Sequence, residues 1–206
     1  MASRAYECIA KIGETIHENK DFLTDLDREI GDADHGVNMS RGFAAVEEKV
    51  AQDEEDIGKV LKKTGMTLLS TVGGASGPLY GTAYMEAAKV LNGKTKLEAE
   101  DFTAALEAAI AGIQKRGKAV QGEKTMLDSL FPALEAYKAA IAEGKNIGEG
   151  LDAAVEAAEK GIEFTKTIRA TKGRASYLGD RSIGHQDPGA TSATLTLKTI
   201  RDFIKG

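Results

Sequence analysis

The sequence has 206 residues, 42% hydrophobic and 29% charged, a balance typical of one folded globular domain and not of a disordered chain. The net charge is -5 and the basic residues are interleaved with acidic ones, which argues against nucleic-acid binding. No apolar run approaches the ~20 residues of a membrane span, and the N-terminus lacks a signal-peptide core. The single cysteine, Cys8, excludes a disulfide within the chain. We therefore expect a cytoplasmic protein.

Helical periodicity dominates the sequence, while alternating strand patterns are nearly absent. Met39, Phe43, Val46 and Val50, for example, fall on one face of a helix. Cys8 lies on a similar amphipathic stretch and is predicted to be a small buried hydrophobe. We therefore predict a single all-α domain, an antiparallel up-and-down bundle or barrel of eight helices, at residues 3–20, 38–51, 55–71, 78–92, 99–116, 125–143, 147–169 and 190–205.

Four connections between these helices differ from plain turns. We call them the first loop (26–37), the second loop (72–77), the third loop (117–124) and the fourth loop (170–189). They contain much of the glycine and two of the three histidines. Because alternate connections of an up-and-down bundle share an end, and all four follow odd-numbered helices, we expect them to meet at one end of the molecule.

The first loop brings three carboxylates into eight positions, at Asp27, Asp32 and Asp34. Hard cations such as Mg²⁺ prefer oxygen ligands, and the glycines at 31 and 36 would let the chain fold back so that the carboxylates converge. The spacing does not fit an EF-hand. The loop is thus either a metal site or a solvated acidic turn.

The second loop is rich in glycine and leads into a helix, an arrangement that can bind an anion through free backbone N–H groups. A tight turn between helices would explain it equally well. A stretch at 112–119 nearly matches a P-loop, but it ends in alanine and lies at a helix end rather than between a strand and a helix. The ordinary P-loop and dinucleotide-binding folds are therefore rejected.

The fourth loop is long for a connection without its own helical period, which favours a functional segment. Arg174 and Arg181 could each meet phosphate oxygens, or form surface ion pairs. Among the histidines, His17 is predicted to be exposed, His35 to bind a metal or a phosphate, and His185 to pack the loop.

Four groups of motifs follow one another along the chain: GDADHG (31–36), GGASGPLYG (73–81), KRGK (115–118) with GEKTM (122–126), and KGRASYLG (172–179) with GHQDPG (184–189). In these motifs and in their order, the sequence resembles the L-subunit family of bacterial dihydroxyacetone kinases. The resemblance extends from about residue 3 to the C-terminus.

The resemblance implies an eight-helix barrel that binds ADP or ATP at one end through two Mg²⁺ ions, with no catalytic residue beyond this site. Asp27, Asp32 and Asp34 would bind the metal ions. It also implies phosphoryl transfer to dihydroxyacetone on a separate K subunit, with recharging of the ADP by an M-type phosphocarrier subunit of the phosphotransferase system, or direct use of ATP. The implied nucleotide contacts are His35, Asn38, Ala75, Ser76, Gly117, Met126, Arg174, Asp187, Pro188 and Gly189.

Two alternatives remain open at this point. An ADP-loaded regulatory module could bind a transcription factor, and a related kinase component could serve a short sugar such as erythrulose. Neither nucleic acid nor a membrane is an expected partner.

Overall fold

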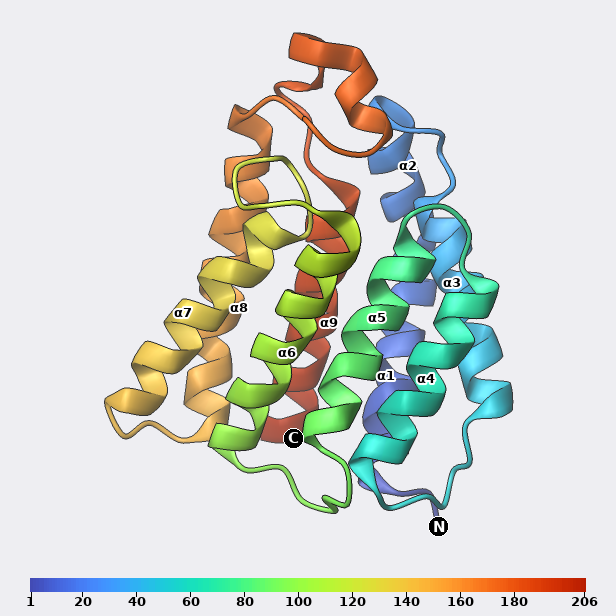
Figure 1. Cartoon of the computed structure of the whole chain (residues 1–206), viewed down its shortest axis with the longest axis vertical. Helices are drawn as coiled ribbons and strands as arrows, with labels where there is room; N and C mark the ends of the chain where they lie inside the picture. The colour runs from blue at the N-terminus through green and yellow to red at the C-terminus, as the bar shows by residue number, and fades with distance from the viewer.

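The computed structural model describes residues 1–206 and consists of helices and connecting segments without a β-strand (Figure 1), which confirms the all-α prediction. None of its helices is long and apolar enough to cross a bilayer. The helices are α1 (Arg4–Glu18), α2 (Lys20–Ile30), α3 (His35–Lys49), α4 (Ile57–Thr71), α5 (Ser76–Val90), α6 (Ala99–Gly117), α7 (Leu127–Ala142), α8 (Ile147–Thr167), the 3-10 helix η1 (Arg174–Ser182) and α9 (Pro188–Lys205).

Eight of the helices form a closed ring. Each of α3 to α8 packs on its neighbour in sequence, α8 packs on α9, and α9 packs on α1, which in turn contacts α3. Successive helices of the ring run in opposite directions, and both termini lie at the lower end in Figure 1. The predicted eight-helix antiparallel barrel is therefore present.

The sequence patterns did not predict two elements, helix α2 and the 3-10 helix η1, which lies within the fourth loop that was expected to lack a helical period. The expected helix at 3–20 ends at Asn19, whose side-chain amide donates to the carbonyl of Thr15 at 2.8 Å and so satisfies an end group of α1. A second helix then begins at once and extends to Ile30, into the segment expected as the first loop. It lies at the upper end of the barrel, against α3 and α9. The buried residues of α2 are Leu23, Asp27 and Ile30, which follow a helical spacing, but the middle one is a carboxylate that the sequence analysis assigned to a loop.

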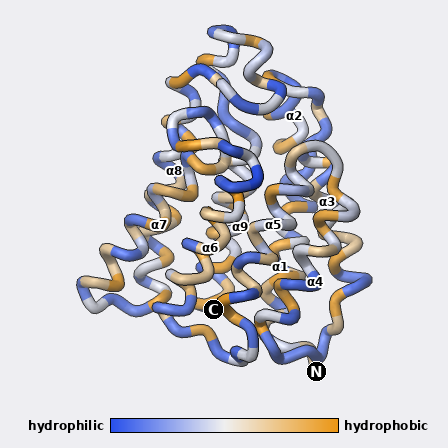
Figure 2. Tube along the Cα trace, in the orientation of Figure 1, coloured by the Kyte–Doolittle hydropathy of each residue, from blue (hydrophilic) through white to orange (hydrophobic).

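The expected apolar stripes form the core. Met39, Phe43, Val46 and Val50 of the α3 segment are all buried. Figure 2 shows hydrophobic and hydrophilic residues alternating along the helices, as amphipathic helices require. Cys8 is half-buried and packs against this core, in line with its predicted role.

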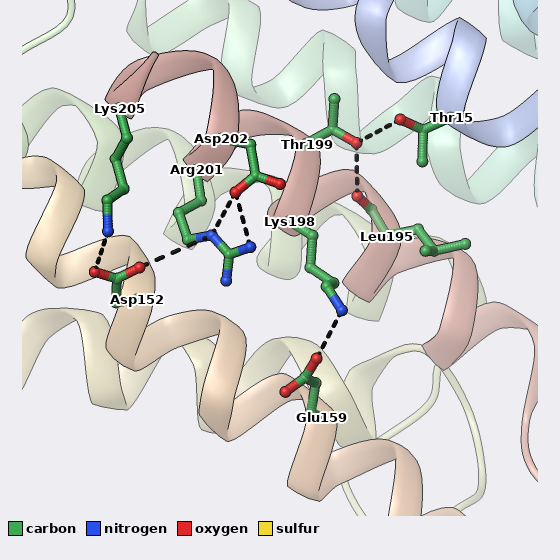
Figure 3. A network of polar contacts seen from close by, with 9 residues as sticks. All are labelled: Thr15, Asp152, Glu159, Leu195, Lys198, Thr199, Arg201, Asp202 and Lys205. Carbon is green, nitrogen blue, oxygen red and sulfur yellow. Dashed lines mark hydrogen bonds and ion pairs between the residues drawn. The ribbon is translucent and has the colours of Figure 1, made fainter.

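Helix α9 completes the ring between α1 and α8 (Figure 3). The hydroxyl groups of Thr199 and Thr15 are hydrogen bonded at 2.9 Å on the α1 side. On the α8 side, Lys205 lies 2.6 Å from Asp152 and Lys198 lies 2.8 Å from Glu159. These ion pairs are exposed and contribute little to stability individually, so the packing of α9 rests mainly on its apolar face.

A mostly apolar cavity of about 450 Å³ lies among the helices of the barrel. Cys8 and Tyr84 are among its lining residues, while Tyr80, Ile113 and Met126 line both this cavity and a second, more polar one at the upper end. Those three residues therefore lie where the two cavities approach each other.

Candidate functional site

All four loops line the cavity at the upper end, which has a volume of about 400 Å³. Each contributes at least two residues, and the cavity size suits a small-molecule ligand. The parity argument from the sequence is thus confirmed. It held although α2 was missed, because α2 follows α1 without a reversal of the chain.

Four helices begin at this cavity. His35, Ser76, Leu127 and Pro188 are the first residues of α3, α5, α7 and α9, and all four line the cavity. The N-terminus of a helix carries unpaired N–H groups and a partial positive charge. An antiparallel barrel brings every second helix start to the same end, and here the starts surround one space. The cavity therefore favours an anion.

Three carboxylates lie beside these helix starts. One ligand atom from each of Asp27, Asp32 and Asp34 lies within 4.8 Å of the others, close enough to bind shared cations. Asp27, in the last turn of α2, is buried and accepts hydrogen bonds from the N–H groups of Asp34 at 2.8 Å and His35 at 3.2 Å. Asp34 precedes α3 but makes no side-chain capping bond, so its carboxylate is available to a ligand.

The two glycines of this segment are required by close contacts. A Cβ atom at Gly31 would lie 2.0 Å from Oδ1 of Asp27, and one at Gly36 would lie 2.0 Å from the carbonyl oxygen of Lys20. The first glycine leaves room for the Asp27 carboxylate, and the second lets the start of α3 approach α2. The chain reversal expected from glycine is present, but its cause is steric, since Gly31 does not adopt a left-handed conformation.

His35 connects three parts of the site. Its Nδ1 lies 3.0 Å from Oγ of Ser76 in α5, and its Nε2 lies 2.9 Å from Oγ of Ser192 in α9. Ser192 also bonds to the hydroxyl of Tyr80 at 2.7 Å. Burial lowers the pKa of His35 to about 4, against the attraction of Asp27, so the ring is neutral at pH 7. Both ring nitrogens are engaged with serine hydroxyls, which makes His35 a connector of the helix starts.

The fourth loop contains η1 and contributes basic side chains to the cavity. Arg174, its first residue, lies with Nε 2.8 Å from Oδ2 of Asp32. Lys172 also lines the cavity, as does Arg116 at the end of α6. Arg181, the other candidate for phosphate contact, is exposed and outside the cavity lining.

Asp187 lies near the end of the fourth loop and is the N-cap of α9. Its carboxylate accepts from the N–H of Ala190 at 2.7 Å, and its own N–H donates to Oγ1 of Thr165 at 3.1 Å. Burial raises the pKa of this carboxyl to about 7, partly offset by the backbone bond from Ala190. The cavity is therefore lined by one carboxyl group, that of Asp187, whose pKa lies close to neutral pH.

The residues singled out from the sequence are largely brought together. All three aspartates line the cavity, as do the expected nucleotide contacts except Asn38. Asn38 is buried below the second loop and accepts from Nη2 of Arg41 at 2.7 Å.

His17 is exposed as predicted, and His185 lies outside the cavity lining. Sequence reasoning assigned no role to Lys124 and Asp128, two buried charged residues of the third loop and the start of α7. Lys124 lies in the GEKTM motif, whereas no sequence signal pointed to Asp128.

Fold and cavity together define an all-helical protein that presents a carboxylate cluster suited to a hard cation and helix starts suited to an anion at one end. The sequence matches the DAK2 domain over residues 29–202, and the chain belongs to this family.

The chain is similar to bacterial kinase subunits over nearly its whole length. It is 46% identical over 193 residues to the ADP-binding subunit DhaL of the PEP-dependent dihydroxyacetone kinase of Escherichia coli, covering 93% of this chain and 92% of that protein. It is 48% identical over 184 residues to the corresponding subunit of kinase 1 of Listeria innocua, covering 89% and 87%. These two bacterial relatives are subunits of kinases, which are phosphotransferases, and this confirms the resemblance seen in the motifs.

The fold is also found within longer chains. The human triokinase/FMN cyclase is 36% identical over 199 residues, which cover 96% of this chain and 34% of that protein. The crystal structure of the native dihydroxyacetone kinase of C. freundii superimposes with a TM-score of 0.72 at 23% identity, covering 96% of this chain and 34% of that one. A crystal structure of that enzyme in complex with AMP-PNP and Mg²⁺ gives a TM-score of 0.70.

Proposed function

We propose that the chain binds ADP or ATP together with two Mg²⁺ ions in the upper cavity and acts as the nucleotide-binding subunit of a dihydroxyacetone kinase. The observation that carries the proposal is that three carboxylates and four helix starts face one space. Carboxylates alone would repel a nucleotide, and helix starts alone would bind an anion without a metal. Their combination suits a magnesium-bound polyphosphate.

The donor set fits magnesium. The three carboxylates supply hard oxygen ligands, and a magnesium ion held by them would neutralise phosphate charge. We assign metal binding to Asp27, Asp32 and Asp34. We assign the nucleotide to the surrounding segments, with contacts from His35, Asn38, Ala75, Ser76, Gly117, Met126, Arg174, Asp187, Pro188 and Gly189. Asn38 would act from below the second loop, because it does not line the cavity.

Phosphoryl transfer fits a site of this composition. Such a transfer depends mainly on positioning and on neutralising charge, with little covalent chemistry by the protein. The bond between the γ-phosphorus and the bridging oxygen would break, a substrate hydroxyl oxygen would form the new bond, and ADP would stay in the cavity. The helix starts and Arg174 would hold the phosphate oxygens in place. The substrate hydroxyl would have to lose its proton to the subunit that binds the sugar.

We assign two partners to the chain. A K-type subunit would hold dihydroxyacetone at the mouth of the cavity. An M-type phosphocarrier subunit would recharge the bound ADP. Support comes from the relatives, which are ADP-binding subunits of kinases described as PEP-dependent or, in Lactococcus lactis, PTS-dependent.

Nucleotide retention tests this function directly. Native mass spectrometry of the purified protein should show ADP and magnesium bound at one site, and addition of excess ATP should show whether the nucleotide exchanges. Product formation should appear when the K and M subunits of a close bacterial relative and phosphoenolpyruvate with its phosphotransferase proteins are added. A protein that binds neither ADP nor ATP in the presence of Mg²⁺ would refute the proposal.

A further inference from the structure

Lys124 is a buried lysine at the end of the third loop. It is 2% exposed, and its ammonium group donates to the carbonyl oxygens of Thr165, Ile168 and His185. An ammonium group has three N–H donors, so these three acceptors satisfy it fully. The side chain is therefore part of the framework and does not extend freely toward a ligand.

Two of the three acceptors lie just before the fourth loop, and the third lies near its other end. Thr165 is in the last turn of α8 and Ile168 is its C-cap, where carbonyl groups lack helical partners and the helix dipole attracts a cation. His185 lies two residues before Asp187, the N-cap of α9. One side chain thus joins the point where the chain leaves α8 to the point where it enters α9.

The backbone around Lys124 is held in an unfavourable conformation. Its φ angle is +61°, in the left-handed region that glycine adopts without strain and other residues rarely occupy. Asp128, fully buried, fixes this turn by accepting from the N–H groups of Gly122 and Thr125. The three hydrogen bonds of the lysine side chain offset the strain that glycine would avoid.

The preceding residue attaches the same turn to the start of the fourth loop. The carbonyl of Glu123 accepts from the N–H of Thr171 at 3.3 Å, and its carboxylate accepts from Oγ1 of Thr171 at 3.1 Å. The same carboxylate lies 3.7 Å from Nζ of Lys172. The cavity-lining residues 172–174 therefore start from a fixed point.

We propose that Lys124 is a positioning residue that closes the base of the fourth loop and thereby holds Arg174 and residues 187–189 against the nucleotide. The consequence for nucleotide retention rests on the proposed function, while the closure of the loop does not. A neutral side chain at 124 would leave buried carbonyl groups without donors and would free both ends of the loop.

Three variants of the full chain test the proposal. Lys124→Met removes the charge at similar length. Lys124→Gly removes the side chain but also relieves the left-handed strain, which separates the loss of the contacts from a general loss of stability. Lys124→Arg keeps the charge in a different shape. The matched control is Lys166→Met, since Lys166 also lies near the end of α8 but its half-buried side chain pairs with Glu163 at 2.7 Å.

Hydrogen–deuterium exchange of the nucleotide-free protein is the first measurement. Lys124→Met and Lys124→Gly should accelerate exchange across residues 170–187 by about tenfold or more, because opening the loop would no longer break charge-assisted hydrogen bonds. Exchange in α4 and α5 should stay unchanged in these variants. Across residues 170–187, the exchange rate of Lys124→Arg should lie between those of wild type and Lys124→Met, and the rate of Lys166→Met should equal that of wild type. ADP release at saturating Mg²⁺ should accelerate in the same order.

Two results would overturn the proposal. The first is an exchange rate across residues 170–187 in Lys124→Met or Lys124→Gly that equals the wild-type rate. The second is an equal increase of the exchange rate in α4 and α5, which would make Lys124 an ordinary stabilising residue. If Lys124→Met does not fold, Lys124→Gly decides. If the wild-type protein binds no nucleotide, the proposed function fails, but the exchange measurement still decides whether Lys124 closes the loop.

Discussion

Arg174 and Asp32 form an ion pair between the fourth and the first loop, with Nε 2.8 Å from Oδ2. Both side chains are partly exposed, Arg174 at 66% and Asp32 at 36%. Asp32 is also one of the three carboxylates placed to bind a cation. A guanidinium group and a metal ion therefore have one carboxylate in common. We expect them to compete for it, so that a bound metal frees Arg174 to turn its planar donors toward phosphate oxygens.

Arg174→Ala should accelerate ADP release by the equivalent of about 1.5–3 kcal/mol, the value of a hydrogen bond to a charged group. Arg174→Lys should have a smaller effect, because it keeps the charge but loses the planar pair of donors. The off-rate of a fluorescent ADP analogue at saturating Mg²⁺ measures this. The control is Arg181→Ala, an exposed arginine of the same loop outside the cavity lining. Equal off-rates in all four proteins would remove Arg174 from the site.

Asp32→Ala and Asp34→Ala should each abolish retention of Mg–ADP while leaving the helical content intact. Each change leaves a metal ion short of a ligand and reduces the screening between protein and phosphate charge. Calorimetric titration of each protein with ADP in the presence of Mg²⁺ measures its affinity for Mg–ADP, and circular dichroism checks the fold. Asp25→Ala serves as a control, since Asp25 is an exposed aspartate of α2 paired with Arg28. Unchanged Mg–ADP affinity in both variants would reduce the segment to a solvated acidic turn.

The isolated protein should not phosphorylate dihydroxyacetone from ATP. The upper cavity is of a size that a nucleotide would largely fill, and the interior cavity is lined almost entirely by hydrophobic residues, which suit a polar sugar poorly. A coupled assay for dihydroxyacetone phosphate measures the activity with and without the K subunit of a bacterial relative. Robust product formation by the pure chain would show that it binds the sugar itself.

The sequence was sufficient to predict the barrel because its main signals are local. The stripe from Met39 to Val50 specifies one buried face, and short connections specify antiparallel neighbours. The same reasoning failed at α2, since its short buried face includes the carboxylate of Asp27, which was interpreted as part of a loop. It also placed the start of α3 at 38, whereas the helix begins at His35, because the aspartates beside it were interpreted only as loop residues.

The candidate site was predictable in its members but not in its contacts. Carboxylates at Asp27, Asp32 and Asp34 can be recognised by residue type and spacing. The pairing of Arg174 with Asp32 joins residues far apart in the chain, and no periodicity encodes it. Lys124 looks like an ordinary surface lysine until the end of α8 is placed over it. Buried charges are fixed by tertiary packing, which a single sequence does not display.

The stability of the protein should fall at alkaline pH through Cys8. Burial raises the pKa of this thiol from its ordinary value of 9.0 to about 12, with a smaller opposing effect of Arg4. The native state therefore keeps the proton while the unfolded chain loses it above about pH 9, so unfolding becomes more favourable as the pH rises from 9 toward 12, by up to about 1.4 kcal/mol per pH unit. Below pH 9 both states are protonated and Cys8 has no effect on the pH dependence. The buried hydroxyls of Tyr80 and Tyr84, whose pKa values burial also raises, act in the same direction above pH 10.

A comparison of wild type with Cys8→Ala isolates this contribution. Urea unfolding of both proteins is measured at about pH 8, 9 and 10, which bracket the ordinary pKa of a thiol. The variant should lose some packing at every pH, because a side chain that contacts the core is shortened. Its free energy of unfolding should nevertheless decline less steeply above pH 9 than that of wild type, since it has no thiol to ionise. Parallel declines in the two proteins would show that the Cys8 thiol ionises as readily in the folded barrel as in the unfolded chain.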